Sequence, residues 1–264
     1  MGLLDQSSYL DHLRRESARF AEVLAGCDPA ARVPSCPDWD ASDLLWHLTT
    51  VQHFWARRVL DRPTGPDDDV EPVRPEAYAD LLRGYGEAAA ALVEALDGVD
   101  VRAEAWTWHP TDHTVGFILR RQAHEALIHR LDAELAAGTP TELDPVLASD
   151  GVEEALAVMF GGCPPWGTFT PLDRHVRVDA IDTDQQVWVQ LGQFTGTDPE
   201  GTSYDEPDIR VVPARDGEPD AVVAGTAADL DAWLWRRRDG ADVQVVGDRG
   251  AYDRFRVAVN QPIT

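Results

Sequence analysis

The spacing of apolar residues changes once along this chain, and that change limits the folds it can adopt. Up to about residue 160, apolar side chains such as Leu13, Phe20 and Leu24 recur at the spacing of helices that bury one face. After the run GGCPPWG (residues 161–167) apolar and polar residues alternate instead, as in HVRVDA (residues 175–180). Alternation indicates strands with one buried face. The glycines and prolines between the two patterns predict a linker.

The two patterns predict an α+β fold in two domains. The first helix is expected to end at Gly26, and further helices are expected over residues 41–60, 76–96, 114–138 and 145–160. Four long helices joined by loops predict an antiparallel four-helix bundle within residues 1–161. Strands are expected over residues 175–180, 186–191, 209–212, 220–224 and 243–246, with helices over residues 227–238 and 252–259. This order predicts a smaller α+β domain over residues 168–264, with helices against a mostly antiparallel sheet.

The charge balance excludes some classes of partner. The formal net charge is −24, from 47 acidic and 23 basic residues, and the chain contains no lysine. Nucleic acids and anionic membrane surfaces require a basic footprint, so neither is expected to be a partner. An arginine-only, alanine-rich and aspartate-rich composition is typical of GC-rich bacterial genomes.

The sequence also favours a cytoplasmic location. No apolar stretch approaches the roughly 18–20 residues of a membrane span. The first residues, MGLLDQ, lack the basic and apolar regions of a signal peptide. Cys27, Cys36 and Cys163 are an odd number at wide spacing, which predicts reduced thiols rather than a disulfide framework.

Two separate segments supply the ligand types of a catalytic metal site. Glu125 and His129 lie in HEALIHRLD (residues 124–132), and His47 lies in DLLWHL (residues 43–48); both segments are predicted to be helical. Residues four apart on a helix lie within about 40° of each other, so Glu125 and His129 share one face. With His47 from a facing helix they make two imidazoles and one carboxylate, an open ligand set for a divalent metal.

The spacing distinguishes this set from a metalloprotease motif. His124 is five residues from His129, about 140° around the helix, and is not expected to bind the same ion. Zincins instead carry two histidines four residues apart, so proteolysis is not predicted. Three protein ligands leave one coordination position open, where an ion lowers the pKa of a bound water or thiol.

Each of these residues also has an ordinary structural interpretation. His47 can be a core histidine hydrogen-bonded to a carbonyl group. Glu125 and His129 can be a simple pair four residues apart, which stabilises a helix by only a few tenths of a kcal/mol. In the metal interpretation, Gln122 and Asp132 flank the pair and can orient His129.

Several segments, taken in order, resemble a known family. VPSCPDWD (residues 33–40) followed by DLLWHL resembles the start of the second helix of the mycothiol-dependent maleylpyruvate isomerase family, whose N-terminal bundle is DinB-like. RQAHE (residues 121–125) through HRLDAE (residues 129–134) is similar to its second motif. LASDGVEE (residues 147–154) and LDAWLWRR (residues 230–237) are similar to its later signatures.

The resemblance implies a function as well as a fold. The family has a zinc-binding N-terminal bundle and a C-terminal domain similar to sterol-carrier proteins. It uses mycothiol, the small thiol of actinobacteria, and His47, Glu125 and His129 match its metal ligands. In the isomerase, zinc activates the mycothiol thiolate, which adds to a cis double bond, and rotation and elimination give the trans isomer. Other members are thought to transfer the thiol to electrophiles.

One departure from the family concerns the expected substrate contact. The family often has Gly-Arg after Trp-Leu-Trp, whereas this chain has Arg236-Arg237-Arg238. Arg237 occupies the matching position and is the predicted catalytic-site arginine, able to hold a substrate carboxylate bidentately. Its alternative is a solvated arginine at a helix C-terminus, where cations suit the helix dipole.

The sequence therefore predicts a zinc-dependent enzyme that uses mycothiol for isomerisation of, or S-transfer to, a small electrophile. Its expected partners are this substrate and the thiol; the sequence predicts no oligomeric state. Two alternatives stay open, a metal-dependent hydrolase and a module that binds thiol or metal without turnover.

Overall fold

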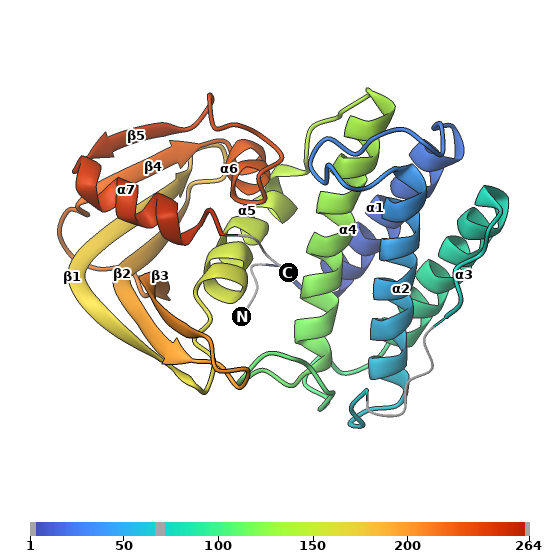
Figure 1. Ribbon diagram of the computed structural model, residues 1–264, viewed down its shortest axis with the longest axis horizontal. Coiled ribbons are helices and arrows are strands. Elements are labelled where there is room, and N and C mark those ends of the chain that lie inside the picture. Colours follow the sequence, from blue (N-terminus) through green and yellow to red (C-terminus); the bar gives the residue numbers. More distant parts are fainter. Residues whose placement is uncertain (1–3, 67–71, 262–264) are drawn as a thin grey trace. The chain divides into compact units, whose positions relative to one another are not determined.

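The structure is a computed structural model that describes residues 4–66 and 72–261 (Figure 1). Contacts divide the chain into two compact units, Met1–Leu143 and Asp144–Thr264. The first is helical and the second combines helices with a five-stranded sheet, so the predicted α+β class is confirmed. The acidic run at residues 67–69, predicted as a solvated loop, lies outside the described residues.

The N-terminal unit is the predicted four-helix bundle. Its helices are α1 (Gln6–Ala25), α2 (Ala41–Leu60), α3 (Tyr78–Leu96) and α4 (Val115–Ala137). Helix α1 packs against α3 and α4, and helix α2 also packs against α3 and α4. The two helices that carry the predicted metal ligands, α2 and α4, are therefore neighbours (Figure 1).

Local capping explains where these two helices begin and end. At the start of α2, the side chain of Asp40 accepts a hydrogen bond from the Asp43 backbone at 3.0 Å, and Asp43 accepts one from the Asp40 backbone at 3.1 Å. This reciprocal capping gives hydrogen-bond partners to two backbone N–H groups that have no carbonyl partner within the helix. At the start of α4 the Thr114 hydroxyl accepts a hydrogen bond from the Phe117 backbone at 3.2 Å. Gly138, at a φ of 70°, ends α4 in the left-handed conformation that glycine adopts most easily.

Helix α4 is buried on most sides, and its charged residues are paired within the bundle. Arg130 Nε donates to Glu16 of α1 at 2.7 Å, and Arg130 Nη1 donates to Glu134 one turn away at 2.9 Å. Glu134 also accepts from Arg19 Nε at 2.9 Å and from the Thr141 backbone at 2.8 Å. These partners replace the water that the buried charges lose on folding.

The C-terminal unit is built on one sheet with the strand order β3-β2-β1-β4-β5. Its strands are β1 (Gly167–Ala180), β2 (Gln185–Thr197), β3 (Ser203–Val212), β4 (Ala221–Gly225) and β5 (Gln244–Gly247). All neighbouring pairs are antiparallel except β1 and β4, which are parallel. The predicted mostly antiparallel sheet is thus confirmed.

Strands β1 and β2 are longer than the apolar alternation predicts. Their pairing continues to Gly167 opposite Gly196, so β1 begins inside the predicted linker. The β1 residues from Thr170 to Arg174 are exposed, and an exposed stretch of strand leaves no apolar alternation to detect.

The helices of this unit are α5 (Pro145–Glu154), the π-helix η1 (Ala155–Phe160), α6 (Ala227–Leu234) and α7 (Arg249–Ala258). Helix α6 ends four residues before the predicted end at Arg238, because Arg236 adopts a φ of 61°. Helix α5 packs against α6 and therefore belongs to the same compact unit as the sheet. The helical spacing of its apolar residues instead led the sequence prediction to place it with the bundle. The boundary between residues 161 and 168 stays a prediction. Over the described ranges, no helix has both the length and the apolar character that crossing a bilayer requires.

Candidate functional site

The candidate site is a polar cluster between α2 and α4 of the bundle. His47 lies two turns into α2, and its side chain is 32% exposed. The ring of Trp39, from the loop before α2, lies 4.7 Å from the His47 ring between centroids. The His47 side chain is therefore partly exposed to solvent and is not a fully buried core histidine.

Helix α4 brings the other two predicted ligands to the same place. His129 Nε2 lies 3.1 Å from Glu125 Oε1, and His47 Nε2 lies 3.7 Å from the same oxygen. The two imidazole rings meet edge to face, with centroids 4.9 Å apart. One ligand atom from each of the three residues lies within 4.8 Å of the others. The structure therefore brings together His47, Glu125 and His129.

Other side chains orient the two α4 residues. His129 Nδ1 lies 2.9 Å from Asp132 Oδ2, and the Ser35 hydroxyl donates to the other oxygen of Asp132. Arg121 Nη2 donates to Glu125 Oε2 at 3.1 Å, which leaves Oε1 to the two histidines. An ionised carboxylate only accepts hydrogen bonds, so Asp132 keeps a hydrogen on Nδ1 and aims Nε2 at the cluster.

In this cluster, hydrogen bonds and neighbouring charges shift the pKa values in the opposite direction to burial. Burial raises the pKa of Glu125, but hydrogen bonds from His129 and His47 and the charges of His129 and Arg121 outweigh it and hold that pKa well below its usual range. Burial lowers the pKa of His129, but hydrogen bonds and charge from Asp132 and Glu125 outweigh it and raise this pKa to about 9. Two carboxylates, Glu125 and Asp132, therefore stabilise positive charge at the His129 ring, and the same carboxylates would favour a cation bound there.

The donor set suits a divalent transition metal. Two ligands of one zinc ion, each bonded at about 2.0–2.2 Å, lie roughly 3–4 Å apart. The separations of 3.1 Å and 3.7 Å between the imidazole nitrogens and Glu125 Oε1 fall in this range. Imidazole and carboxylate together suit zinc, iron, nickel or manganese. Three protein donors leave room for a substrate atom or solvent.

Three further residues were singled out in the sequence, and each has its own local contacts. Arg237 belongs to the C-terminal unit and follows α6 rather than lying on it; its Nη1 donates to the Trp235 carbonyl at 2.6 Å. His124, on α4, meets the ring of Tyr9 edge to face with centroids 6.3 Å apart. Cys36 packs half-buried against the bundle core.

Two orienting residues escaped the sequence analysis. Arg121 precedes Glu125 by one helical turn, so a search for oppositely charged residues four apart would find it. Ser35 lies 97 positions from Asp132 in a loop, and no local pattern links them.

Comparisons with known proteins agree with this architecture. The sequence model described as the mycothiol maleylpyruvate isomerase N-terminal domain matches residues 10–134, and the model of that family's C-terminal domain matches residues 146–254. A search of curated protein sequences found no significant match.

Two solved structures share the fold. One is a crystal structure of the mycothiol-dependent maleylpyruvate isomerase, with 15% sequence identity and a TM-score of 0.59. The other is a histidine-to-alanine mutant of that enzyme, with 14% identity and a TM-score of 0.58. Each alignment covers 92% of this chain and 93% of the other.

Proposed function

This chain belongs to the mycothiol-dependent maleylpyruvate isomerase family, and we propose that it is a metal-dependent enzyme that uses mycothiol as its thiol cosubstrate. It isomerises, or transfers the thiol to, a small electrophile. The observation that carries the proposal is the convergence of His47 and His129 on one oxygen of Glu125. The packing of a helical bundle does not require two histidines and a glutamate to meet at a partly exposed position.

His47, Glu125 and His129 are the proposed ligands, and zinc is the proposed ion. When bound, the ion supplies a Lewis acid that lowers the pKa of a thiol, so that thiolate exists at neutral pH. The chain's own residues do the positioning. Asp132 holds the His129 ring, Ser35 holds Asp132, and Arg121 holds Glu125. The Trp39 ring packs beside the His47 ring and supports its position.

The proposed chemistry needs only a reversible addition. Addition of a thiolate to a conjugated cis double bond converts it to a single bond, about which the adduct rotates. Elimination restores the double bond in the trans form and returns the thiol, so no redox cofactor is consumed. We assign to Arg237 the role of binding a substrate carboxylate, since a guanidinium pairs bidentately with that group.

The first test is metal content. Wild type, His129→Ala and His53→Ala are purified side by side, incubated with zinc and analysed for metal per chain. His53 also lies on α2 and is outside the three-residue cluster, which makes it a matched control. We expect about one ion per chain in wild type and His53→Ala, and little in a still-folded His129→Ala. Equal metal in all three, or none in any, would contradict the proposed site.

The second test separates the functions that remain open. Zinc-loaded protein is incubated with mycothiol and either maleylpyruvate or a panel of electrophiles, and thiol and product are followed. Isomerisation without net loss of thiol supports the isomerase, and stoichiometric loss supports S-transfer. Ester or amide hydrolysis without thiol would instead identify a hydrolase, and metal binding without any turnover a binding module.

A further inference from the structure

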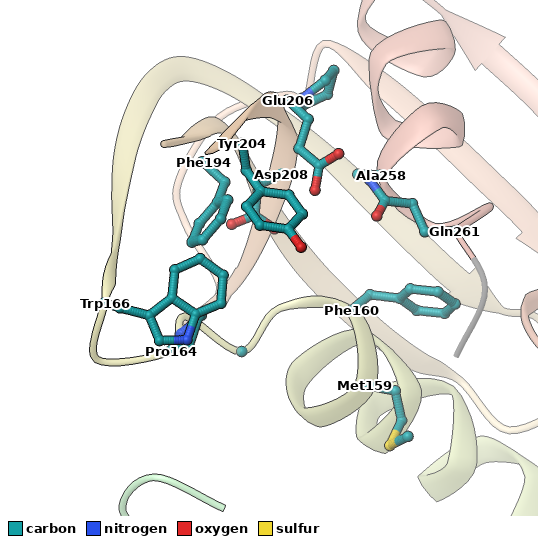
Figure 2. A pocket seen from close by; sticks show the side chains of 12 residues that line it. Met159, Phe160, Pro164, Trp166, Phe194, Tyr204, Glu206, Asp208, Ala258 and Gln261 are labelled. Atoms are coloured by element: carbon teal, nitrogen blue, oxygen red, sulfur yellow. The ribbon is translucent and has the colours of Figure 1, made fainter. Parts of the chain in front are cut away.

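A cavity of about 260 Å³ lies within the C-terminal unit, and its lining includes none of the proposed metal ligands. It is lined by the end of η1, the segment from Gly162 to Trp166 that precedes β1, strands β2 and β3, and the end of α7 with the residues after it. Figure 2 shows aromatic rings and two carboxylates around it. Its volume is just below the usual range of small-molecule sites, so it suits a ligand of few atoms.

Three aromatic rings form one wall of this cavity. Trp166 meets Phe194 edge to face with centroids 5.4 Å apart, and it lies 5.5 Å from Tyr204. The Tyr204 hydroxyl donates to Asp198 at 2.9 Å, which fixes its ring. Gly167 leaves the space that the Phe194 ring fills, since a Cβ there would lie 2.0 Å from it. The wall is therefore held in place by the strands around it.

Two carboxylates lie beside these rings. Glu206 and Asp208 are two residues apart on β3, so both side chains project from the same face of the strand. Figure 2 shows the Glu206 carboxylate directed into the cavity. Burial raises the pKa of Asp208 to about 6, although a hydrogen bond from the Ile209 backbone lowers it, and the neighbouring charge of Glu206 raises it further.

No basic side chain is among the described residues that line the cavity. Arg210 follows Asp208 by two positions on β3 and its charge lowers the Asp208 pKa, but its guanidinium lies over the Phe169 ring at 4.4 Å. The lining thus combines two carboxylates with aromatic rings and has no basic side chain among its described residues, and this combination disfavours anions.

We propose that this cavity binds a small organic ammonium ion, with Glu206 and Asp208 facing its charge and Trp166 and Tyr204 facing its alkyl groups. An inorganic divalent cation would need several oxygen ligands and would gain nothing from the aromatic wall. A neutral apolar ligand would leave both carboxylates desolvated without a partner. Only an alkylated cation uses both features. The adjacent π-helix η1 is a further sign, because π-helical turns are frequent at functional sites.

The test uses the full chain with choline as the probe. Its neutral carbon analogue, in which a tert-butyl group replaces the trimethylammonium group, has the same shape without the charge. Binding is followed by calorimetry and by NMR. We expect choline to saturate one site per chain, and the neutral analogue to bind at least about tenfold more weakly.

Variants assign the binding to the cavity. We expect Glu206→Gln and Trp166→Leu each to weaken choline binding by about tenfold. Asp205→Asn is the matched control, since Asp205 is exposed on the same strand and is not among the cavity residues; it should leave binding unchanged.

Three results would overturn the proposal. One is equal affinity for choline and the neutral analogue, and another is no choline binding by folded protein. The third is choline binding that Ca²⁺ displaces and Trp166→Leu does not weaken, which would show an acidic site without an aromatic contribution. None of these binding measurements requires metal in the bundle. Their results therefore do not depend on whether the proposed enzyme activity is found.

Discussion

The buried residue Asp132 decides how His129 presents its ring. The carboxylate lies 2.9 Å from Nδ1 and is completely buried. We expect Asp132→Asn to weaken zinc binding by about 10–100-fold, the range found when an orienting carboxylate behind a metal-binding histidine is altered. A competitive chelator titration measures the change.

Its control is Asp80→Asn, the same substitution at a half-exposed position on α3. Zinc affinity should stay at the wild-type value in this control. Unchanged affinity in Asp132→Asn would show that Asp132 does not orient a metal ligand.

Asp208 provides a pH-dependent prediction. Its pKa rises from an ordinary 3.8 to about 6 in the folded protein, chiefly through burial. A raised pKa favours folding below pH 3.8, and this contribution is lost as pH rises through 6, so the ionised carboxylate destabilises the protein at pH 7.5. At about 1.4 kcal/mol per pKa unit, reduced by screening at a partly exposed group, Asp208→Asn should raise the free energy of unfolding by about 1–2 kcal/mol at pH 7.5.

Urea unfolding at pH 7.5 and pH 4 measures this effect. The gain should be near zero at pH 4, where the carboxylate of wild type is protonated in the folded state. Asp205→Asn, the same substitution at an exposed position of β3, is measured beside it as the control. An equal gain for Asp208→Asn at both pH values would mean that its charge is not the cause.

At the residue scale, the sequence predicts the three residues of the cluster better than the residues that orient them. Glu125 and His129 are detectable because four residues on a helix return to the same face. His47 is detectable because a histidine on an apolar helix face needs a partner. Ser35 contacts Asp132 only because a loop folds back on the bundle. Contacts between segments so distant in sequence depend on the tertiary structure and leave no periodic signal.

At the scale of helices, the ion cluster that joins α1 to α4 should contribute strongly to stability. Arg130 is buried and pairs with Glu16 and Glu134, which are also buried. We expect Arg130→Met to lower the free energy of unfolding by about 3–5 kcal/mol, because it removes the cation paired with buried Glu16 and one of the two cations paired with buried Glu134. Urea unfolding followed by circular dichroism measures the loss.

Arg19→Met is the comparison within the same cluster. Arg19 also contacts Glu134, but its side chain is 38% exposed, and we expect a much smaller loss than for Arg130→Met because solvent screens the pair. Similar losses in the two variants would show that burial does not set the strength of this cluster.

Helix and strand limits were predictable only where local chemistry fixes them. The predicted ranges 41–60 and 114–138 agree with α2 and α4, which Asp40 caps at its start and Gly138 ends, respectively. The predicted end of α6 at Arg238 was wrong. Three successive arginines are compatible with a helix, and the sequence does not reveal the positive φ of Arg236. The π-helix η1 has no recognised sequence pattern, since its apolar spacing resembles that of an ordinary helix.

At the scale of the whole molecule, one change of apolar period was enough to predict an α+β chain. The place in the sequence where the period changes says less about the division into units. Helix α5 has a helical period but packs against α6 of the C-terminal unit. Periodicity reports which face of an element is buried and not which neighbour buries it.

The grouping of all three proposed ligands within Met1–Leu143 leads to the last prediction. A ligand that binds only the folded state stabilises it by RT ln(1 + [L]/Kd), about 2.7 kcal/mol at one hundred times Kd. Zinc should therefore raise the thermal midpoint of wild type and slow hydrogen exchange most in α2 and α4, with less change in the sheet. His53→Ala should respond like wild type, and His129→Ala should not respond. Equal protection in both units, or a response retained in His129→Ala, would place the zinc elsewhere on the chain.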